Sequence, residues 1–260
     1  MNNHSVSSVG RVDSADIAVP EHEKEERFYS RILCTGEAPL WNEDLMNNMG
    51  TPIIGLGKRT AEYDLLPLQW MPHIQVSNVA SSAKSALELG GTELMHGKDD
   101  DGNSQWAVLT DPNGAAFGII PIVPSEASSS QDGAESPVGR IRRIDLAAAN
   151  AQEARDFYSN VTGWSWDACN KEDSNGAYID YRMLDGDGKP VADICHARGF
   201  HQKLPSVWML HLPVGDLTES SRRAREEGGK VLKEARGDDG KLTHVVVQDP
   251  VGACITLIPG

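Results

Sequence analysis

The sequence is short of basic residues and of long apolar runs. Its 260 residues include 24 lysines and arginines against 38 aspartates and glutamates, a formal net charge of −14 at pH 7. Nucleic acids and anionic membranes bind basic surfaces, so this charge argues against both kinds of partner. No stretch approaches about 18 consecutive apolar residues, so no membrane-spanning helix is expected.

Cysteine is scarce as well, and the common catalytic motifs are missing. The four cysteines lie far apart and form neither a CxxC pair nor a zinc-binding spacing, so we expect reduced thiols in a cytoplasmic protein. The first residues, MNNHSVSSVG, lack the cationic start and apolar core of a secretory signal, and residues 1–9 are predicted to be flexible. There is no P-loop, no GxSxG and no HExxH motif.

What the sequence does contain is an internal repeat. Residues 70–122 align with residues 208–260 at a constant offset of 138, with 20 identities in 53 positions and no gap. Both copies share a Trp-Met-x-His opening, a Gly-Gly pair and a DPxGA segment. The preceding segments repeat at an offset of 129, where GRVDSADIAV (10–19) matches GRIRRIDLAA (139–148) and the tripeptide FYS recurs. A duplication explains both matches.

The repeat predicts the domain organisation. Residues 123–138, VPSEASSSQDGAESPV, have the composition of a solvated linker between domain one (10–122) and domain two (139–260). The first copy is nine residues shorter between its first helix and the next strand, so one wall of that domain should be short or open. We expect a monomer that folds alone, with a homodimer as the alternative.

Hydrophobic periodicity predicts an α+β fold of repeated βαβββ modules. In the first copy, Val12–Val19 and Met71–Val76 read as strands, while Glu21–Leu33 and Val79–Leu89 read as helices. The second of these helices should stop at its Gly-Gly pair. A closing hairpin is expected around the Asp-Pro-Asn-Gly turn at 111–114, and the second copy repeats the pattern.

These motifs resemble the vicinal oxygen chelate superfamily, which includes glyoxalase I, bleomycin- and fosfomycin-resistance proteins and extradiol dioxygenases. The resemblance rests on IDLAAANAQEARDFYSNVTGW (144–164), the W-M-x-H…V…GG units and DPxGA, and it is closest to two-domain bacterial glyoxalase-like proteins. It implies two cup-shaped domains, with four modules in one chain, around small-molecule cavities. Because the superfamily includes isomerases, dioxygenases, transferases and binding proteins, it implies no single activity.

The resemblance also implies where a metal would bind. Relatives usually hold a divalent ion by His, Gln or Glu on the first strand of each module and by Glu on the last strand. The matching positions here are Ser14, Met71 and Gly118 in the first copy, and Arg143, Met209 and Thr256 in the second. None is a good donor for such an ion, and Arg143 would repel one. We therefore predict no metal at the usual site, although binding of a divalent metal stays open.

Strand alternation places an Asp and a His on one face in both copies. These are Asp16 and His73 in the first copy, and Asp145 and His211, next to Arg143, in the second. A carboxylate beside an imidazole can orient it for proton transfer, or form half of a metal site. The alternative is a structural hydrogen bond that only braces the sheet.

A third group of candidates lies on one strand of the second copy. Tyr178 and Arg182 alternate there, and Arg182 would bind a carboxylate or phosphate if this face lines the cavity. If the face points outward, it is a solvated edge.

We expect a glyoxalase- or bleomycin-resistance-like protein that binds a small organic molecule, an anion being one candidate, mainly in the second domain. The alternative is a metal-dependent lyase, isomerase or dioxygenase of the same superfamily, and whether the protein is an enzyme stays open. The predicted ligand-binding residues are Arg143, Asp145, His211, Tyr178, Arg182, Asp16 and His73.

Overall fold

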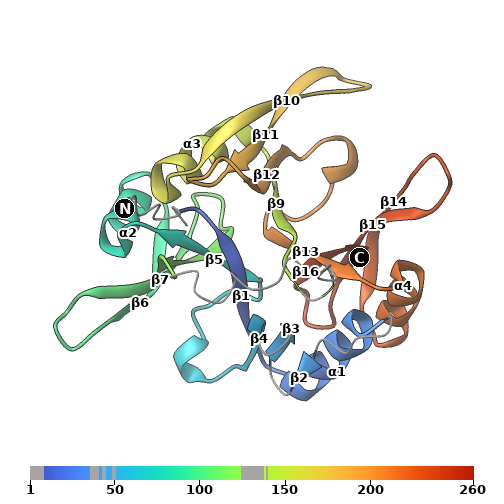
Figure 1. The fold of residues 1–260 in the computed structure, drawn as a ribbon, viewed down its shortest axis with the longest axis horizontal. Coiled ribbons are helices and arrows are strands. Elements are labelled where there is room, and N and C mark those ends of the chain that lie inside the picture. The colour runs from blue at the N-terminus through green and yellow to red at the C-terminus, as the bar shows by residue number, and fades with distance from the viewer. Residues whose placement is uncertain (1–8, 36–40, 43–44, 49–50, 124–137, 139) are drawn as a thin grey trace, which may run out of the picture. The chain divides into compact units, whose positions relative to one another are not determined.

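The computed structural model describes the chain except residues 1–8, 36–40, 43–44, 49–50, 124–137 and 139 (Figure 1). The predicted terminus 1–9 and linker 123–138 therefore lie almost wholly outside the described residues. The first copy contains β1 (Val12–Val19), α1 (His22–Leu33), β2 (Trp41–Asn42), β3 (Leu45–Asn48), β4 (Thr51–Lys58), β5 (Met71–Val76), α2 (Val79–Glu88), β6 (Thr92–Lys98), β7 (Ser104–Thr110) and β8 (Ala116–Pro121). The second contains β9 (Arg143–Ala148), α3 (Ala151–Thr162), β10 (Ser165–Asp173), β11 (Gly176–Leu184), β12 (Pro190–His196), β13 (Trp208–Val214), α4 (Leu217–Glu226), β14 (Lys230–Arg236), β15 (Leu242–Gln248) and β16 (Cys254–Pro259).

This order confirms the predicted α+β fold of tandem βαβββ modules. The strands form two eight-stranded sheets, with the orders β2-β3-β4-β1-β5-β8-β7-β6 and β10-β11-β12-β9-β13-β16-β15-β14. The two orders match position by position, as a duplication requires. Within each module the first strand is parallel to the last, as for β1 with β4 and β13 with β16, and the hairpin pairs are antiparallel.

By packing, the chain forms two compact units, each with one module from each copy. Unit 1 draws on residues 1–12, 73–132 and 146–206, and unit 2 on residues 13–72, 133–145 and 207–260. The predicted domains 10–122 and 139–260 follow the repeat along the sequence instead, and they remain a prediction.

Motifs shared by the copies explain the packing inside each unit. In unit 2, a Cβ on Gly229 would lie 2.7 Å from Cε2 of Phe28, so this glycine lets the α1 ring approach the backbone. In unit 1, a Cβ on Gly91 would lie 3.2 Å from Cζ of Phe157 on α3. The FYS segment of one copy therefore packs on the Gly-Gly pair of the other, and aromatic rings anchor both helix pairs.

The remaining repeat motifs are local caps and turns. Asn78 and Asp216 stand at the same repeat position, and their side chains accept the backbone N–H of Ser81 and Glu219 to cap α2 and α4. In the DPxGA turns, the carboxylates of Asp111 and Asp249 each accept several backbone N–H groups of the same turn. These bonds account for the identity of the turns in both copies.

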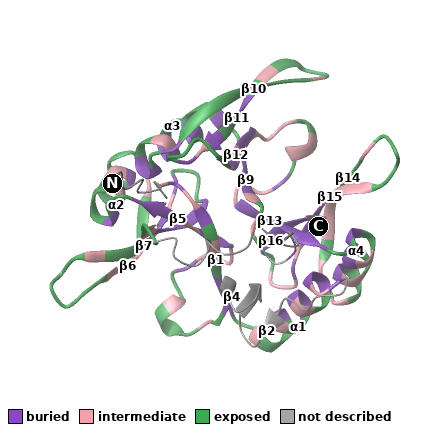
Figure 2. Cartoon of the chain, in the orientation of Figure 1, coloured by how far each residue is buried: buried purple, intermediate pink, exposed green. Residues whose placement is uncertain are grey.

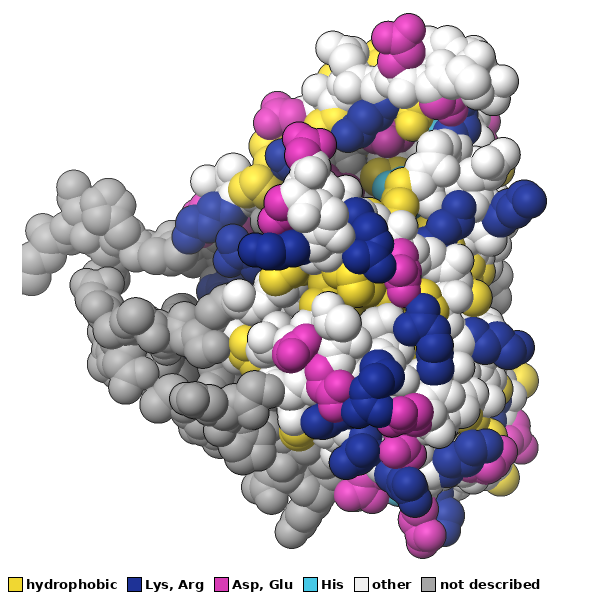
Figure 3. All heavy atoms as spheres, turned by 90° about the vertical axis from the view of Figure 1, so that its right-hand side faces the viewer, with side chains coloured by type: hydrophobic (Ala, Val, Ile, Leu, Met, Phe, Trp, Pro, Cys, Tyr) yellow, Lys and Arg dark blue, Asp and Glu magenta, His cyan; other side chains and the backbone are white. Residues whose placement is uncertain are grey.

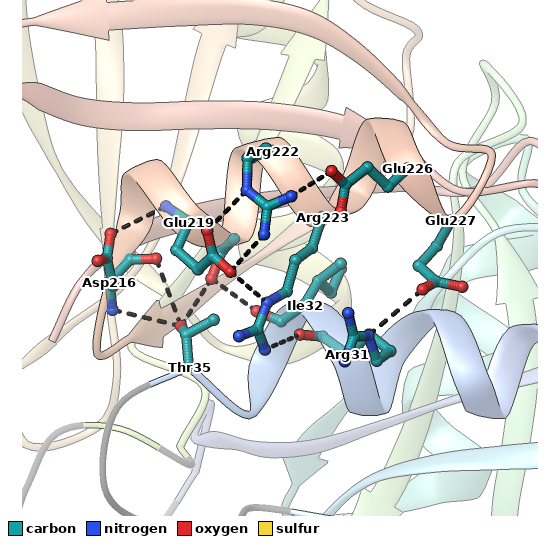
Figure 4. Close-up of polar contacts among 10 residues, drawn as sticks. Arg31, Ile32, Thr35, Asp216, Glu219, Arg222, Arg223, Glu226 and Glu227 are labelled. Atoms are coloured by element: carbon teal, nitrogen blue, oxygen red, sulfur yellow. Dashed lines mark hydrogen bonds and ion pairs between the residues drawn. The ribbon is translucent and has the colours of Figure 1, made fainter.

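The α1–α4 contact of unit 2 is bridged by polar side chains (Figure 4). Ser220 Oγ lies 2.7 Å both from the carbonyl oxygen of Ile32 and from Thr35 Oγ1. Glu219 pairs with Arg222 and Arg223, which lower the pKa of this carboxyl to about 2. Acidic and basic side chains accordingly mix on the lower part of the face in Figure 3, where α4 lies.

Buried residues lie mainly along the first and last strands of each module and on the inner sides of the helices (Figure 2). The hairpin β10–β11 and the tips of β6–β7 and β14–β15 are largely exposed. Among the described residues, no helix has the length and apolar character needed to cross a membrane.

Candidate functional site

The strongest candidate site in unit 2 lies where β9 begins beside β13. The backbone N–H of Arg142 donates to the carbonyl oxygen of His211 at 2.9 Å, which fixes the two strands side by side. Arg143 and Asp145 are two residues apart and share one strand face. Asp145 is 7% exposed and His211 is 3% exposed, so both polar groups are almost fully buried.

Side chains connect these three residues in a row. Arg143 Nε donates to His211 Nδ1 at 3.4 Å. The other ring nitrogen of His211, Nε2, lies 3.1 Å from Asp145 Oδ1, a close polar approach outside hydrogen-bond alignment. The structure therefore brings together the three residues that sequence alternation placed on one face.

The contact with Arg143 determines which tautomer of His211 fits this row. Because Arg143 Nε–H has only a proton to offer, His211 Nδ1 must act as the acceptor. The ring proton then lies on Nε2, facing the carboxylate of Asp145. In this tautomer the imidazole lies between a guanidinium and a carboxylate, so the row has one positive and one negative end.

Two further residues complete what we call the Arg143 cluster, which comprises Arg143, Asp145, His211, His244 and Thr256. Thr256 on β16 is the register partner of His211 and is buried. The ring of His244 on β15 meets that of His211 edge-on, with 5.9 Å between centroids. The sequence analysis did not predict His244 as a site residue. It lies two residues before Val246, the register partner of Thr256, so it shares the face of Thr256.

The residues of this cluster do not fit the divalent ion that the superfamily implies. The positions where relatives carry ligands hold a guanidinium, a thioether and a hydroxyl, from Arg143, Met209 and Thr256. The two stronger donors nearby, His211 and Asp145, already face each other and Arg143. Over the described residues, no group of three His, Cys, Asp or Glu side chains is arranged to hold a metal.

The equivalent residues of the first copy fall into different units. Asp16 belongs to unit 2, where it is exposed and pairs in register with Gly55 of β4. His73 belongs to unit 1 and is half-buried opposite Gly118 of β8. A Cβ on Gly118 would lie 2.9 Å from the His73 ring, so the glycine makes room for the imidazole.

The other two predicted ligand residues separate within unit 1. Arg182 is exposed on β11 and pairs with Asp193 of β12 at 3.1 Å, which makes it part of a solvated face of the sheet. The ring of Tyr178 lies edge-on to the ring of His196, with 5.8 Å between centroids. The guanidinium of Arg198 lies over the Tyr178 ring, 4.2 Å from its centroid. Tyr178 therefore belongs to a second polar group, which we call the His196 cluster: Tyr178, Asp180, His196 and Arg198.

The comparisons with known proteins agree with this architecture. A family model described as a glyoxalase-like domain matches residues 14–120 and 143–258. The protein named "Putative glyoxylase CFP32", from Mycobacterium bovis and Mycobacterium tuberculosis, is 27% identical over 117 residues. That match covers 44% of this chain and 43% of the relative, less than half the length of either.

Solved structures show the same fold at low identity. A catechol 2,3-dioxygenase has a TM-score of 0.55 at 14% identity, covering 97% of this chain and 93% of that one. An extradiol ring-cleaving dioxygenase from B. fuscum has a TM-score of 0.60 at 13% identity, covering 98% and 72%. A Mn(II)-bound glyoxalase from Novosphingobium aromaticivorans has a TM-score of 0.56 at 15% identity, covering 97% and 82%.

Proposed function

The chain belongs to the glyoxalase-like domain family, and from that premise we propose that it binds a small organic anion at the Arg143 cluster, without the divalent ion usual in the superfamily. The observation that carries the proposal is the row from Arg143 through His211 to Asp145. Its basic end stands at the position where relatives hold a metal ligand. A guanidinium offers a fixed positive charge and a planar fork of donors that matches a carboxylate or phosphate.

The other members of the row would orient that charge. His211 accepts from Arg143 Nε and restricts rotation of the guanidinium about its side chain. Asp145 places its negative charge 3.1 Å from His211 Nε2, which favours the ring tautomer that carries its proton there. A site preorganised in this way loses less conformational entropy on binding than a free arginine would. The competing function is that the row only braces β9 against β13.

The test is a thermal-shift screen of small carboxylates and phosphates against the wild type and two charge-matched variants. Arg143→Ala should abolish the shift produced by the best anion while the protein stays folded by circular dichroism. Arg142→Ala removes the same charge from an exposed neighbour and should keep the shift. The bracing function is supported instead if no anion shifts the wild type and Arg143→Ala mainly lowers its stability.

Metal analysis of the purified protein separates the proposal from the alternative of a metal-dependent lyase, isomerase or dioxygenase. A stoichiometric divalent ion that is lost in an Asp145→Ala or His211→Ala variant would favour that alternative. Anion binding that is unchanged after dialysis against a chelator would favour metal-free binding.

A further inference from the structure

Unit 1 contains a paired Asp and His at the edge of a cavity. Asp180 is 4% exposed, and its Oδ1 accepts both the backbone N–H of His196 at 2.8 Å and the ring Nδ1 of His196 at 3.2 Å. Because a carboxylate only accepts, the proton of a neutral His196 lies on Nδ1. Nε2 is then an acceptor, and across the described residues it makes no hydrogen bond.

The cavity beside His196 is an open surface pocket with a volume of about 560 Å³. His196 and Tyr178 line it together with apolar side chains, among them Ile179, and amides such as Asn170. Lys171, the register partner of Tyr178 on β10, also lines it. A space of this size accommodates a small metabolite.

Lys171 is the cation available to a ligand in this cavity. Among the described residues it forms no ion pair, whereas the nearby Arg198 is bound by Asp173 through Nε at 3.1 Å and Nη2 at 2.6 Å. Arg198 is further fixed by its position over the Tyr178 ring. The cavity therefore presents an unpaired ammonium and an imidazole acceptor, separated by apolar wall.

The Tyr178 hydroxyl adds a donor to the same wall. Burial, followed by the carboxylates of Asp180 and Asp173, raises the pKa of Tyr178, so this hydroxyl keeps its proton. A ligand oxygen can thus be held by donors from Tyr178 or Lys171, while a ligand hydroxyl or amine needs the acceptor at His196 Nε2.

We propose that this cavity is a second binding site, separate in its residues from the Arg143 cluster, for a small aliphatic hydroxycarboxylate. The carboxylate pairs with Lys171, the ligand hydroxyl donates to His196 Nε2, and the carbon chain packs on Ile179 and Ala177. Asp180 is a positioning residue. It makes no contact with the ligand and acts only by imposing the tautomer of His196. The proposal does not depend on the function of Arg143.

The first test reads binding by NMR on the full chain, with the 2-, 3- and 4-hydroxybutyrates as probes. Butyrate lacks the hydroxyl, and 1,3-butanediol lacks the carboxylate, so both serve as matched ligands. The best hydroxybutyrate should bind about tenfold more tightly than either, since each loses one charged or hydrogen-bonded contact. Equal binding of hydroxybutyrate and butyrate, or no binding of any probe, overturns the proposal.

Variants then assign the contacts. His196→Ala and Lys171→Gln should each weaken hydroxybutyrate binding about tenfold. Lys189→Gln makes the same charge change in the turn between β11 and β12, away from the cavity lining, and should have no effect. Arg143→Ala should also leave this binding intact. Loss of binding in Arg143→Ala alone would assign the probe to the other site and overturn this one.

The positioning role of Asp180 has its own readout. Nitrogen-15 shifts of the His196 ring, recorded at a pH where the ring is neutral, should show the proton on Nδ1 in the wild type. Asp180→Asn offers an amide in place of the carboxylate and should move protons toward Nε2, with weaker hydroxybutyrate binding. A wild-type ring already protonated on Nε2 would contradict the proposed acceptor.

Discussion

The two units contain the same tyrosine–aspartate pair, but one neighbouring residue differs. In unit 2, Tyr29 donates to Asp249 Oδ2 at 2.7 Å and accepts from Trp70 Nε1 at 2.9 Å. In unit 1, Tyr158 stands at the repeat position of Tyr29 and lies beside Asp111, the repeat counterpart of Asp249. Beside the pair, unit 2 has Glu25, which is fully buried, where unit 1 has an alanine at position 154.

This difference places an additional buried carboxyl group, that of Glu25, in one of two otherwise similar packing arrangements. Burial, reinforced by the neighbouring Asp249 carboxylate, raises the pKa of Glu25 to about 8. Two carboxyls packed together cannot both ionise without a large electrostatic cost, so the pair retains a proton near neutral pH. The tyrosine beside an aspartate is common to both units, whereas the pair of adjacent carboxyl groups, Glu25 and Asp249, occurs in unit 2.

The largest effect should come from removing Glu25. Its folded pKa lies above the usual value of 4.5, so the folded protein holds a proton that the unfolded chain releases between pH 4.5 and about 8. The unfolding free energy should therefore fall as pH rises through this window, by up to about 1.4 kcal/mol per pH unit. Glu25→Ala, which copies the unit 1 residue, should flatten the decline in urea unfolding measured from pH 5 to pH 8.

An exposed acid on the same helix provides the control. Glu23→Ala also removes one carboxyl from α1 and should leave the pH slope as in the wild type. A residual slope in Glu25→Ala is expected, because burial also raises the pKa of Asp111 in unit 1. If the pH dependence of the unfolding free energy is the same in Glu25→Ala as in the wild type, Glu25 does not cause it, and the proposed difference between the units is wrong.

An intermediate effect should come from the glycines that both units share. A Cβ at Gly91 would lie 2.6 Å from the carbonyl oxygen of Thr110, and one at Gly229 would lie 2.8 Å from that of Gln248. Backbone oxygens cannot rotate away, so Gly91→Ala and Gly229→Ala should each cost about 1–3 kcal/mol of unfolding free energy. Gly57→Ala, where the nearest atom would be 3.8 Å away, should be nearly neutral in the same denaturation series. Similar losses of unfolding free energy at all three sites would mean that close packing does not explain the glycines at positions 91 and 229.

Periodicity predicted much of this architecture. Strands β1 and β5 have the bounds expected from alternation, and the repeat predicted a second copy of every element. The missing nine residues of the first copy correspond to strands of two and four residues, β2 and β3, against nine each in β10 and β11. Alternation also placed Arg143, Asp145 and His211 on one face, because period two fixes the face of each side chain.

Other features could not be read from the sequence, because they depend on which segments meet. Periodicity shows that Phe28 and Phe157 are buried, but it does not show that each packs on the other copy's glycine pair. The contact between Asp180 and His196 joins β11 to the end of β12 across 16 residues, and a register irregularity follows Met183. Without that register, His196 looks like a surface residue at a loop.

The smallest effect separates two serines at one repeat position. Ser220 is fully buried on α4, where its hydroxyl bonds the Ile32 carbonyl and the Thr35 hydroxyl. Ser82 is its counterpart on α2, half-buried and, within the described residues, without a side-chain hydrogen bond. Ser220→Ala removes both hydrogen bonds of this hydroxyl, although Thr35 keeps its contacts with Asp216, and should cost about 1 kcal/mol. Ser82→Ala should stay within about 0.5 kcal/mol of the wild type. Urea unfolding of both variants at a common m-value measures this contrast. Equal costs would show that the serine is retained for helix geometry rather than for the α1–α4 contact of unit 2.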